Sequence, residues 1–191
     1  MKFNRTSQAV AAFLFAAFMA ASIQTAARAA DVGQLRTRID PHVAGVFVNG
    51  KYYGTAAMYG HRERMIALAP GSYKVELKDP RYKTLVANVK IEAGKVSTVR
   101  QYMEPLPKKP ETVLGELTTD GFGNAAIYIN GDYYANAAEL QTPGYSLLLA
   151  PAEYNVKIVP VEGEAVREEK VKIVADETIV IYHGGGMATR K

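Results

Sequence analysis

Residues 46–54 have the sequence VFVNGKYYG, and residues 127–135 have the sequence IYINGDYYA. The two stretches match position by position, and at the same offset IALAPGSYKVEL at 66–77 matches LLLAPAEYNVKI at 147–158. A third block, VKI at 89–91, recurs as VKI at 171–173, one position beyond that offset. Three blocks in one order at near-constant spacing indicate an internal repeat. The sequence therefore predicts one small domain that is present twice.

Each copy has the pattern of strands and turns. Apolar and polar residues alternate over 73–78 and again over 154–158, which is the period of two of a half-buried strand. Asn49-Gly50 and Asn130-Gly131 follow apolar runs, and Asn-Gly accepts the positive φ angles of a type I′ hairpin turn. Short strands with regular turn signals favour a small sandwich. We expect an all-β protein, with two small antiparallel β-sandwich domains in tandem, preceded by a cleavable signal helix.

The N-terminus has the features of an export signal. Two basic residues precede the apolar run AVAAFLFAAFMAA at 9–21, and Ala27-x-Ala29 offers small residues to a signal peptidase. The run is shorter than a bilayer core of roughly 30 Å requires, so a retained anchor is the less favoured alternative. We expect a signal peptide at 1–29, cleavage after Ala29 and no permanent membrane span.

The charge balance and the lack of cysteine exclude several classes of function. The chain has 23 Lys and Arg against 19 Asp and Glu. Lys2, Arg5 and Arg28 leave with the signal, so the mature balance is 20 against 19, or +1. A nucleic-acid binder should show a basic footprint, and none is expected here. The absence of cysteine excludes disulfides, thiol nucleophiles, Cys-ligated metals and the lipid anchor of bacterial lipoproteins.

Proline and glycine divide the rest of the chain. Residues 104–112 contain three prolines, which fix φ and remove backbone donors, so this segment is expected to be an extended linker. The two domains are therefore expected at 35–103 and 113–183. Residues 184–191 lack an apolar pattern, and we expect a flexible tail there.

The first copy carries the motifs of a known family. VFVNGKYYG, LAPGSYKVEL, the turn at 79–82 and VKIEAGKVSTV together resemble the PEGA domain. Pro70-Gly-Ser and Pro151-Ala-Glu stand where that family has its Pro-Glu-Gly-Ala turn, and neither copy has the literal tetrapeptide. The second copy departs further, since Ala152 replaces the turn glycine and Ala135 replaces the glycine at the end of the first motif.

The resemblance implies a fold and a general role. PEGA domains are small β-sandwich modules of exported and surface-associated bacterial and archaeal proteins, often in tandem, without a common catalytic site. The resemblance implies that this protein is a structural or protein-interaction module of the cell envelope, with another envelope protein as partner. The periplasm is the expected location, with the cell surface and secretion as alternatives.

The sequence contains few candidates for catalytic or metal-binding residues. The histidines are His42, His61 and His183, and no spacing joins three or four ligands as a metal site requires. His183-Gly-Gly-Gly186 matches a string from the oxyanion hole of some esterases, but the chain lacks the G-x-S-x-G elbow that such a site needs. We expect no catalytic residue, no metal and no cofactor, and we do not expect an enzyme.

The tyrosines are the candidate binding residues. Tyr52-Tyr53 and Tyr133-Tyr134 follow the two Asn-Gly turns, and neighbours on a strand face opposite sides. One tyrosine of each pair is therefore expected inside and the other outside, with Tyr53 and Tyr134 taken as the outward ones. An exposed tyrosine suits protein or sugar contacts, so a glycan or peptidoglycan ligand is the alternative function. Packing across the hairpin is the favoured explanation of all four.

Overall fold

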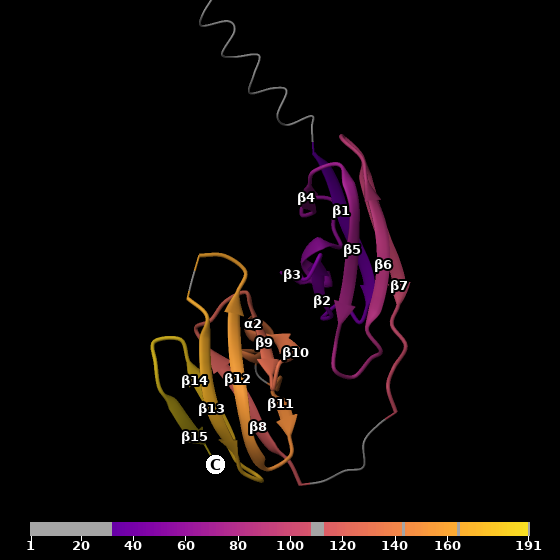
Figure 1. The fold of residues 1–191 in the computed structure, drawn as a ribbon. Coiled ribbons are helices and arrows are strands. Elements are labelled where there is room, and N and C mark those ends of the chain that lie inside the picture. Colours follow the sequence, from indigo (N-terminus) through magenta and orange to yellow (C-terminus); the bar gives the residue numbers. More distant parts are fainter. Residues whose placement is uncertain (1–31, 108–112, 143, 164, 191) are drawn as a thin grey trace, which may run out of the picture.

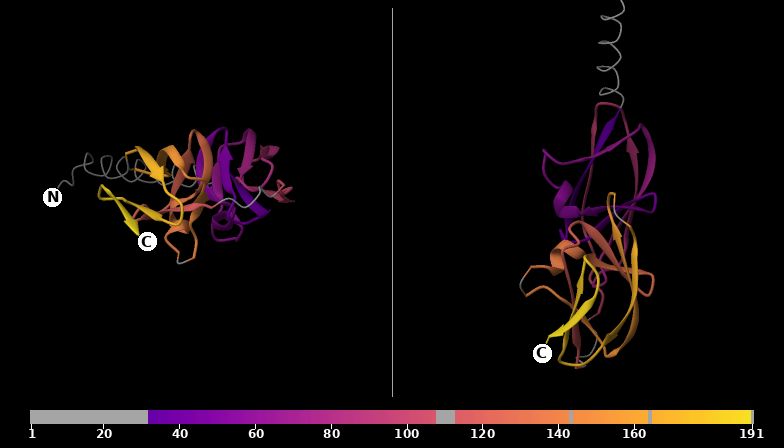
Figure 2. Two further views of the ribbon diagram at one scale, coloured as in Figure 1. Left: turned by 90° about the horizontal axis from the view of Figure 1, so that it is seen from below. Right: turned by 90° about the vertical axis from the view of Figure 1, so that its left-hand side faces the viewer.

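The computed structural model describes residues 32–107, 113–142, 144–163 and 165–190, and it shows two all-β sandwiches in tandem (Figure 1). The expected signal peptide at 1–29 and residues 108–112 of the expected linker lie outside the described residues. Figure 2 shows the two sandwiches stacked end to end. We call the sandwich of β1–β7 the first unit and that of β8–β15 the second unit.

The first unit consists of a three-stranded sheet, in the order β4-β1-β7, that faces a four-stranded sheet in the order β3-β2-β5-β6. A short 3-10 helix, η1, lies between β3 and β4. The bounds are β1 Gly33–Asp40, β2 Gly45–Val48, β3 Lys51–Thr55, η1 Ala56–Tyr59, β4 Ile66–Leu68, β5 Gly71–Lys78, β6 Leu85–Ile91 and β7 Val96–Tyr102.

The second unit repeats this topology and adds one strand. Its sheets have the orders β11-β8-β14-β15 and β10-β9-β12-β13, and a short helix, α2, takes the place of η1. The bounds are β8 Gly115–Asp120, β9 Ala125–Ile129, β10 Asp132–Asn136, α2 Ala137–Leu140, β11 Leu147–Leu149, β12 Ala152–Pro160, β13 Arg167–Ile173, β14 Thr178–Tyr182 and β15 Met187–Arg190.

The Asn-Gly turns have the predicted geometry in both units. Asn49 and Gly50 have φ angles of 49° and 82°, and Asn130 and Gly131 have 51° and 93°. Each asparagine side chain also accepts a hydrogen bond from the next strand of its sheet, at 2.9 Å for Asn49 and 3.0 Å for Asn130. The turns therefore fix the register of β2 and β9 against β5 and β12.

Each sandwich has its own apolar core, because the alternating strand residues point between its two sheets. The core of the first unit is centred on Leu35, Val46, Val75, Leu77 and Ile91. The second core holds their counterparts, namely Leu117, Ile127, Val156, Ile158 and Ile173. The sheets are antiparallel except for one pair in each unit, β1 with β7 and β8 with β14, where the first and last common strands run parallel.

Two segments differ from the sequence-based expectation. Residues 187–190, expected to fray, form β15 and pair antiparallel with β14. Gly185 and Gly186 have φ angles of 104° and 87°, so the glycines make the tight turn into that strand rather than a loose tail. Residues 104–107 of the expected linker also follow the first unit, where the Leu106 N–H donates to the Arg81 carbonyl at 2.8 Å.

Candidate functional site

The four tyrosines named from the sequence occupy two different environments. Tyr52 and Tyr133 are 6% and 7% exposed, whereas Tyr53 and Tyr134 are half-buried. Tyr53 and Tyr134, which were expected to face outward, instead pack against the core of their own unit, so that expectation is wrong. Tyr52 and Tyr133 point away from those cores and are covered by the opposite unit. A ligand-binding role for Tyr53 and Tyr134 stays a prediction.

An aromatic cluster joins the two units. It is formed by Phe47 and Tyr52 of the first unit and Ala126 and Tyr133 of the second. The centre of the Tyr133 ring lies 5.3 Å from the centre of the Phe47 ring, with the two rings edge to face, and 5.5 Å from the centre of the Tyr52 ring. These are favourable aromatic separations, worth about 0.5–1.5 kcal/mol per pair beyond the area buried. We call this set of residues the inter-unit cluster.

A glycine makes room for the Tyr133 ring. A Cβ atom built on Gly45 would stand 2.5 Å from the Tyr133 Cζ, closer than carbon atoms approach. Since Gly45 lies at the start of β2, the ring packs on the backbone of that strand. The residue at the corresponding place of the second repeat is Ala126, which belongs to the same cluster.

A polar contact completes the inter-unit cluster. The Asn136 Nδ2 donates to the Tyr52 hydroxyl at 2.8 Å and to the Asn124 Oδ1 at 2.6 Å. Burial raises the pKa of Tyr52 well above its usual value, so its hydroxyl stays protonated at every physiological pH. The contact between the units therefore combines aromatic packing with a buried hydrogen bond.

The contact is close to two-fold symmetric. β2 contacts β10 and β3 contacts β9, which are reciprocal pairs because β2 and β3 correspond to β9 and β10. Phe47 and Tyr52 likewise correspond to Tyr128 and Tyr133 of the second repeat. The same patch of each repeat thus meets its own counterpart, as in a two-fold homodimer. Two of the four tyrosines that the sequence singled out, Tyr52 and Tyr133, therefore lie at the contact between the units.

Titratable side chains of both units lie near the contact between the units. Asp79 is buried and accepts hydrogen bonds from Arg81, including Nε at 3.0 Å and Nη2 at 2.7 Å. Burial, together with the negative charge of Asp79, raises the pKa of Glu139 in α2 to about 7. Glu139 therefore carries only a partial charge near neutral pH, next to an ion pair of the other unit.

The histidines stand apart from one another in the described part of the chain. His42 and His61 lie in turns of the first unit, and the His183 ring packs edge to face on Phe122 at 5.3 Å. The glycines after His183 build the turn to β15, where the Tyr182 N–H donates to the Gly186 carbonyl at 3.2 Å. Among the described residues, no group of three His, Asp or Glu side chains could hold a metal ion.

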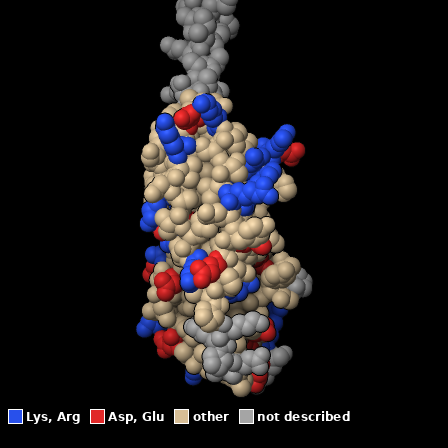
Figure 3. Space-filling view, turned by 90° about the vertical axis from the view of Figure 1, so that its right-hand side faces the viewer, with Lys and Arg blue, Asp and Glu red and all other residues tan. Residues whose placement is uncertain are grey.

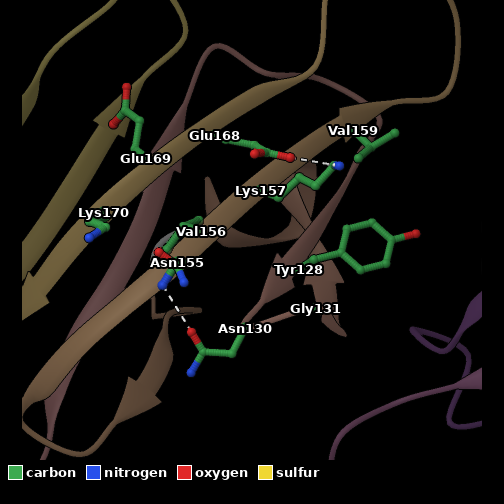
Figure 4. Close-up of a pocket in the computed structure, with 10 residues that line it drawn as sticks. All are labelled: Tyr128, Asn130, Gly131, Asn155, Val156, Lys157, Val159, Glu168, Glu169 and Lys170. Atoms are coloured by element: carbon green, nitrogen blue, oxygen red, sulfur yellow. Dashed lines mark hydrogen bonds and ion pairs between the residues drawn. The ribbon is translucent and has the colours of Figure 1, made fainter.

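A groove on the second unit runs over β9, β12 and β13 (Figure 4). Two pairs of its polar groups are engaged with each other. The Lys157 Nζ lies 2.7 Å from the Glu168 carboxylate, and the Asn155 N–H donates to the Asn130 Oδ1 at 3.0 Å. Tyr128 closes one end beside the inter-unit cluster. Among the described lining residues, the Glu169 Oε2 is a buried oxygen without a hydrogen-bond partner.

A basic face on the first unit was not singled out from the sequence. Arg36 and Arg38 on β1 lie beside Thr98 and Arg100 on β7, and these side chains point outward. Tyr102, at the end of β7, is 82% exposed. Figure 3 looks at the side where β6 and β7 lie, and Lys and Arg side chains stand out on its upper part. The signal in the sequence was that Arg36 and Arg38 alternate with uncharged residues. These arginines form a basic surface with Arg100 only because β1 pairs with β7.

Three comparisons with known proteins bear on identity. The family model of the PEGA domain matches residues 32–107, which is the first unit with the start of the expected linker. No curated protein matches the chain. A solved structure, the Bacillus anthracis TIE protein, aligns with 80% of this chain at 18% identity and a TM-score of 0.31. The chain spans 33% of the length of that structure. Separately, no helix among the described residues is long and apolar enough to cross a membrane.

Proposed function

We propose that this protein is an exported, non-catalytic module of the bacterial cell envelope, built from two PEGA-like domains that act as one interaction body. The first domain is supported by the family match at 32–107. The second is supported by its identical order of common strands and by the repeated sequence blocks. The apolar N-terminal segment supports export to the periplasm.

The observation that carries the proposal is the inter-unit cluster. Two domains of one chain usually move relative to each other unless the interface between them is hydrophobic and extensive. Here Tyr52 and Tyr133 are buried at the contact, and Asn136 reaches across to the Tyr52 hydroxyl. Such a contact holds the two sandwiches in one orientation. A fixed pair of sandwiches presents surfaces at a set spacing, which suits a spacer or adaptor in an assembly.

A quantitative pull-down tests the proposal. The exported protein, tagged at its C-terminus, is used as bait in solubilised envelope extract, with excess untagged protein as competitor and an unrelated tagged envelope protein as control. The expected result is a small set of envelope proteins that the competitor removes. A monomeric bait that retains nothing above the control would reject the interaction role. N-terminal sequencing of the exported chain checks the cleavage site after Ala29.

Glycan binding is the second candidate, and the observation that favours it is the open ring of Tyr102 beside Arg100. Exposed aromatic faces stack on sugars, and arginines pair with acidic groups. Co-sedimentation with purified peptidoglycan tests this candidate in wild type, Tyr102→Ala, Tyr53→Ala and Tyr134→Ala. Glycan binding predicts that Tyr102→Ala lowers the bound fraction. Equal sedimentation of all four proteins would reject a tyrosine platform.

A further inference from the structure

The two units differ in whether a further strand covers one edge of the sheet that contains β7 in the first unit and β14 in the second. In the second unit β15 pairs with β14, and this covers Val180, which is 3% exposed. In the first unit the corresponding strand, β7, ends its sheet, and Thr98 at the position of Val180 is exposed. No strand pairs with the outer side of β7 among the described residues. The second unit therefore supplies its own edge strand, and the described residues of the first unit leave that place open.

The backbone of β7 is arranged to receive a strand. The Gln34 N–H donates to the Lys95 carbonyl at 2.9 Å, and the Met103 N–H donates to the Asp40 carbonyl at 2.8 Å. Residues that bond to one neighbour alternate along a strand with residues that face the other side. The odd-numbered residues of β7 thus bond to β1, and the even-numbered residues direct their N–H and C=O groups to the open edge. These are Val96, Thr98, Arg100 and Tyr102.

The second unit confirms this alternation and shows how a strand is held. Tyr182 corresponds to Arg100 of the first unit, and its N–H donates to the Gly186 carbonyl on the side of β15. β6, at the edge of the facing sheet, comes close to β7, and the bond between them is from the Ser97 hydroxyl to the Lys90 carbonyl, at 2.8 Å. That bond uses no backbone group of β7.

The charge beside the edge is reversed between the units. Beside β15, Tyr182 is in register with Asp120, and Arg190 of β15 donates to the Tyr182 hydroxyl at 3.2 Å. At the corresponding places the first unit has Arg100 in register with Arg38. Neither of these two arginines has a carboxylate of another described residue within 4 Å. β15 carries one arginine beside a face that holds Asp120, whereas the matching face of the first unit holds two arginines, so a segment with carboxylates matches the first unit by charge.

We infer that the open edge of β7 binds an extended acidic segment of a partner protein, which adds as an antiparallel strand and directs its carboxylates to Arg38 and Arg100. Backbone hydrogen bonds supply the affinity in this mode, and the side chains that alternate on one face supply specificity. The partner residue opposite Val96 is apolar, since Val96 is 47% exposed on that face. This inference rests on the proposed function and names the surface that serves it.

Fluorescence anisotropy with a labelled peptide, acetyl-Thr-Thr-Glu-Thr-Glu-Thr-Val-amide, tests the inference on the exported protein. The first glutamate is placed opposite Arg100 and the valine opposite Val96. We expect saturable binding that weakens about tenfold or more when both glutamates become lysines, or in Arg38→Gln/Arg100→Gln. The matched control is Lys51→Gln/Lys74→Gln on the other sheet, away from β7, which should bind as wild type does. Equal binding of the acidic and basic peptides would overturn the inference.

Methylated peptides test the strand geometry without changing the protein. N-methylation of the two glutamates removes the donors that face β7 and should abolish binding, whereas N-methylation of the threonine between them should not. Thr98→Pro removes a backbone donor of the open edge while the backbone bonds to β1 remain, although the side-chain bond from Arg36 to the Thr98 hydroxyl is lost, and it should also abolish binding. Binding that tolerates methylation at both sets of positions would overturn strand addition, whether or not Thr98→Pro folds.

The pull-down separates this inference from the proposed function. Retention of the same envelope proteins by wild type and by Arg38→Gln/Arg100→Gln would reject the β7 surface and leave the interaction role intact. Peptide binding without any specifically retained envelope protein would reject the interaction role. A dimer that forms with rising concentration and is lost in Thr98→Pro, together with no peptide binding, would assign the edge to a second copy of the chain.

Discussion

Gly45→Ala should loosen the contact between the two units. The added Cβ would stand 2.5 Å from Cζ and 2.8 Å from both Cε1 and the hydroxyl oxygen of Tyr133. Ordinary carbon contacts lie at about 3.5–4.0 Å, so the ring must move by about 1 Å. Such a movement disturbs its packing on Phe47 and Tyr52 at the same time. The expected loss is about 1–3 kcal/mol, the usual cost of overpacking a filled core.

Urea unfolding of four proteins measures this loss. They are wild type, Gly45→Ala, Tyr133→Ala and the double variant. Tyr133→Ala alone should cost about 3–5 kcal/mol, because it deletes a buried aromatic side chain. In its background Gly45→Ala should be neutral or slightly stabilising, since the clash is gone and alanine restricts the unfolded chain. The coupling energy of the cycle should therefore account for the whole cost of Gly45→Ala.

Gly184→Ala is the matched control for Gly45→Ala. A Cβ at Gly184 meets no atom within 4 Å, so this variant should unfold as wild type does. Small-angle scattering should in addition show a larger radius of gyration for Gly45→Ala if the units separate. The reasoning is refuted if Gly45→Ala costs no more than Gly184→Ala, or costs the same with and without the Tyr133 ring.

Three further predictions concern other parts of the structure. The pKa of Glu139, raised by burial from 4.5 to about 7, makes a contribution to stability that is full below pH 4.5 and is lost as the pH rises through 7. Glu139→Gln should therefore match wild type in urea unfolding near pH 4 and exceed it near pH 8, by roughly 1 kcal/mol after allowance for solvent screening. Asn49→Ala and Asn130→Ala should each cost about 1–2 kcal/mol in thermal unfolding, because each loses a side-chain hydrogen bond and strains a residue of positive φ. Unequal losses would contradict the equivalence of the two turns. Deletion of residues 187–191 should uncover Val180 and speed hydrogen exchange along β14, while exchange in β7 stays unchanged as the internal control.

The local features of the fold follow from the sequence, and the assembly of those features does not. Alternation along 73–78 and the two Asn-Gly pairs gave the strands and their turns, because both signals are local. Alternation also separated Tyr52 from Tyr53 by face, but it assigned the faces the wrong way round, since Tyr53 rather than Tyr52 packs against the core of its own unit. It could not show what covers the outer face, since Tyr133 comes from a strand of the other repeat and only the packed structure brings the two rings together.

The C-terminal strand shows the same limit in another form. Three glycines followed by MATR contain no alternating pattern, so residues 184–191 resembled a tail. β15 forms because β14 presents backbone groups at its edge, and a strand of four residues takes its stability from that partner rather than from its own sequence. The basic face of the first unit was missed for a similar reason, because Arg38 and Arg100 lie far apart in the sequence and meet only through the register of β1 with β7.

The comparison of the two units also indicates where their roles diverge. Inside, the same bonds recur at matching positions: the Thr37 hydroxyl donates to the Ala56 carbonyl at 3.1 Å, and Thr119 donates to Ala137 at 3.0 Å. These bonds are buried, and losing one would leave a polar group without a partner, so folding alone explains why both copies keep them. No such constraint acts on the exposed guanidinium of Arg100, whose counterpart is a tyrosine covered by an arginine of β15. Folding does not require this difference, and it lies beside an edge that is filled in the second unit and open in the described part of the first. We therefore expect a partner of the first unit to bind at that edge.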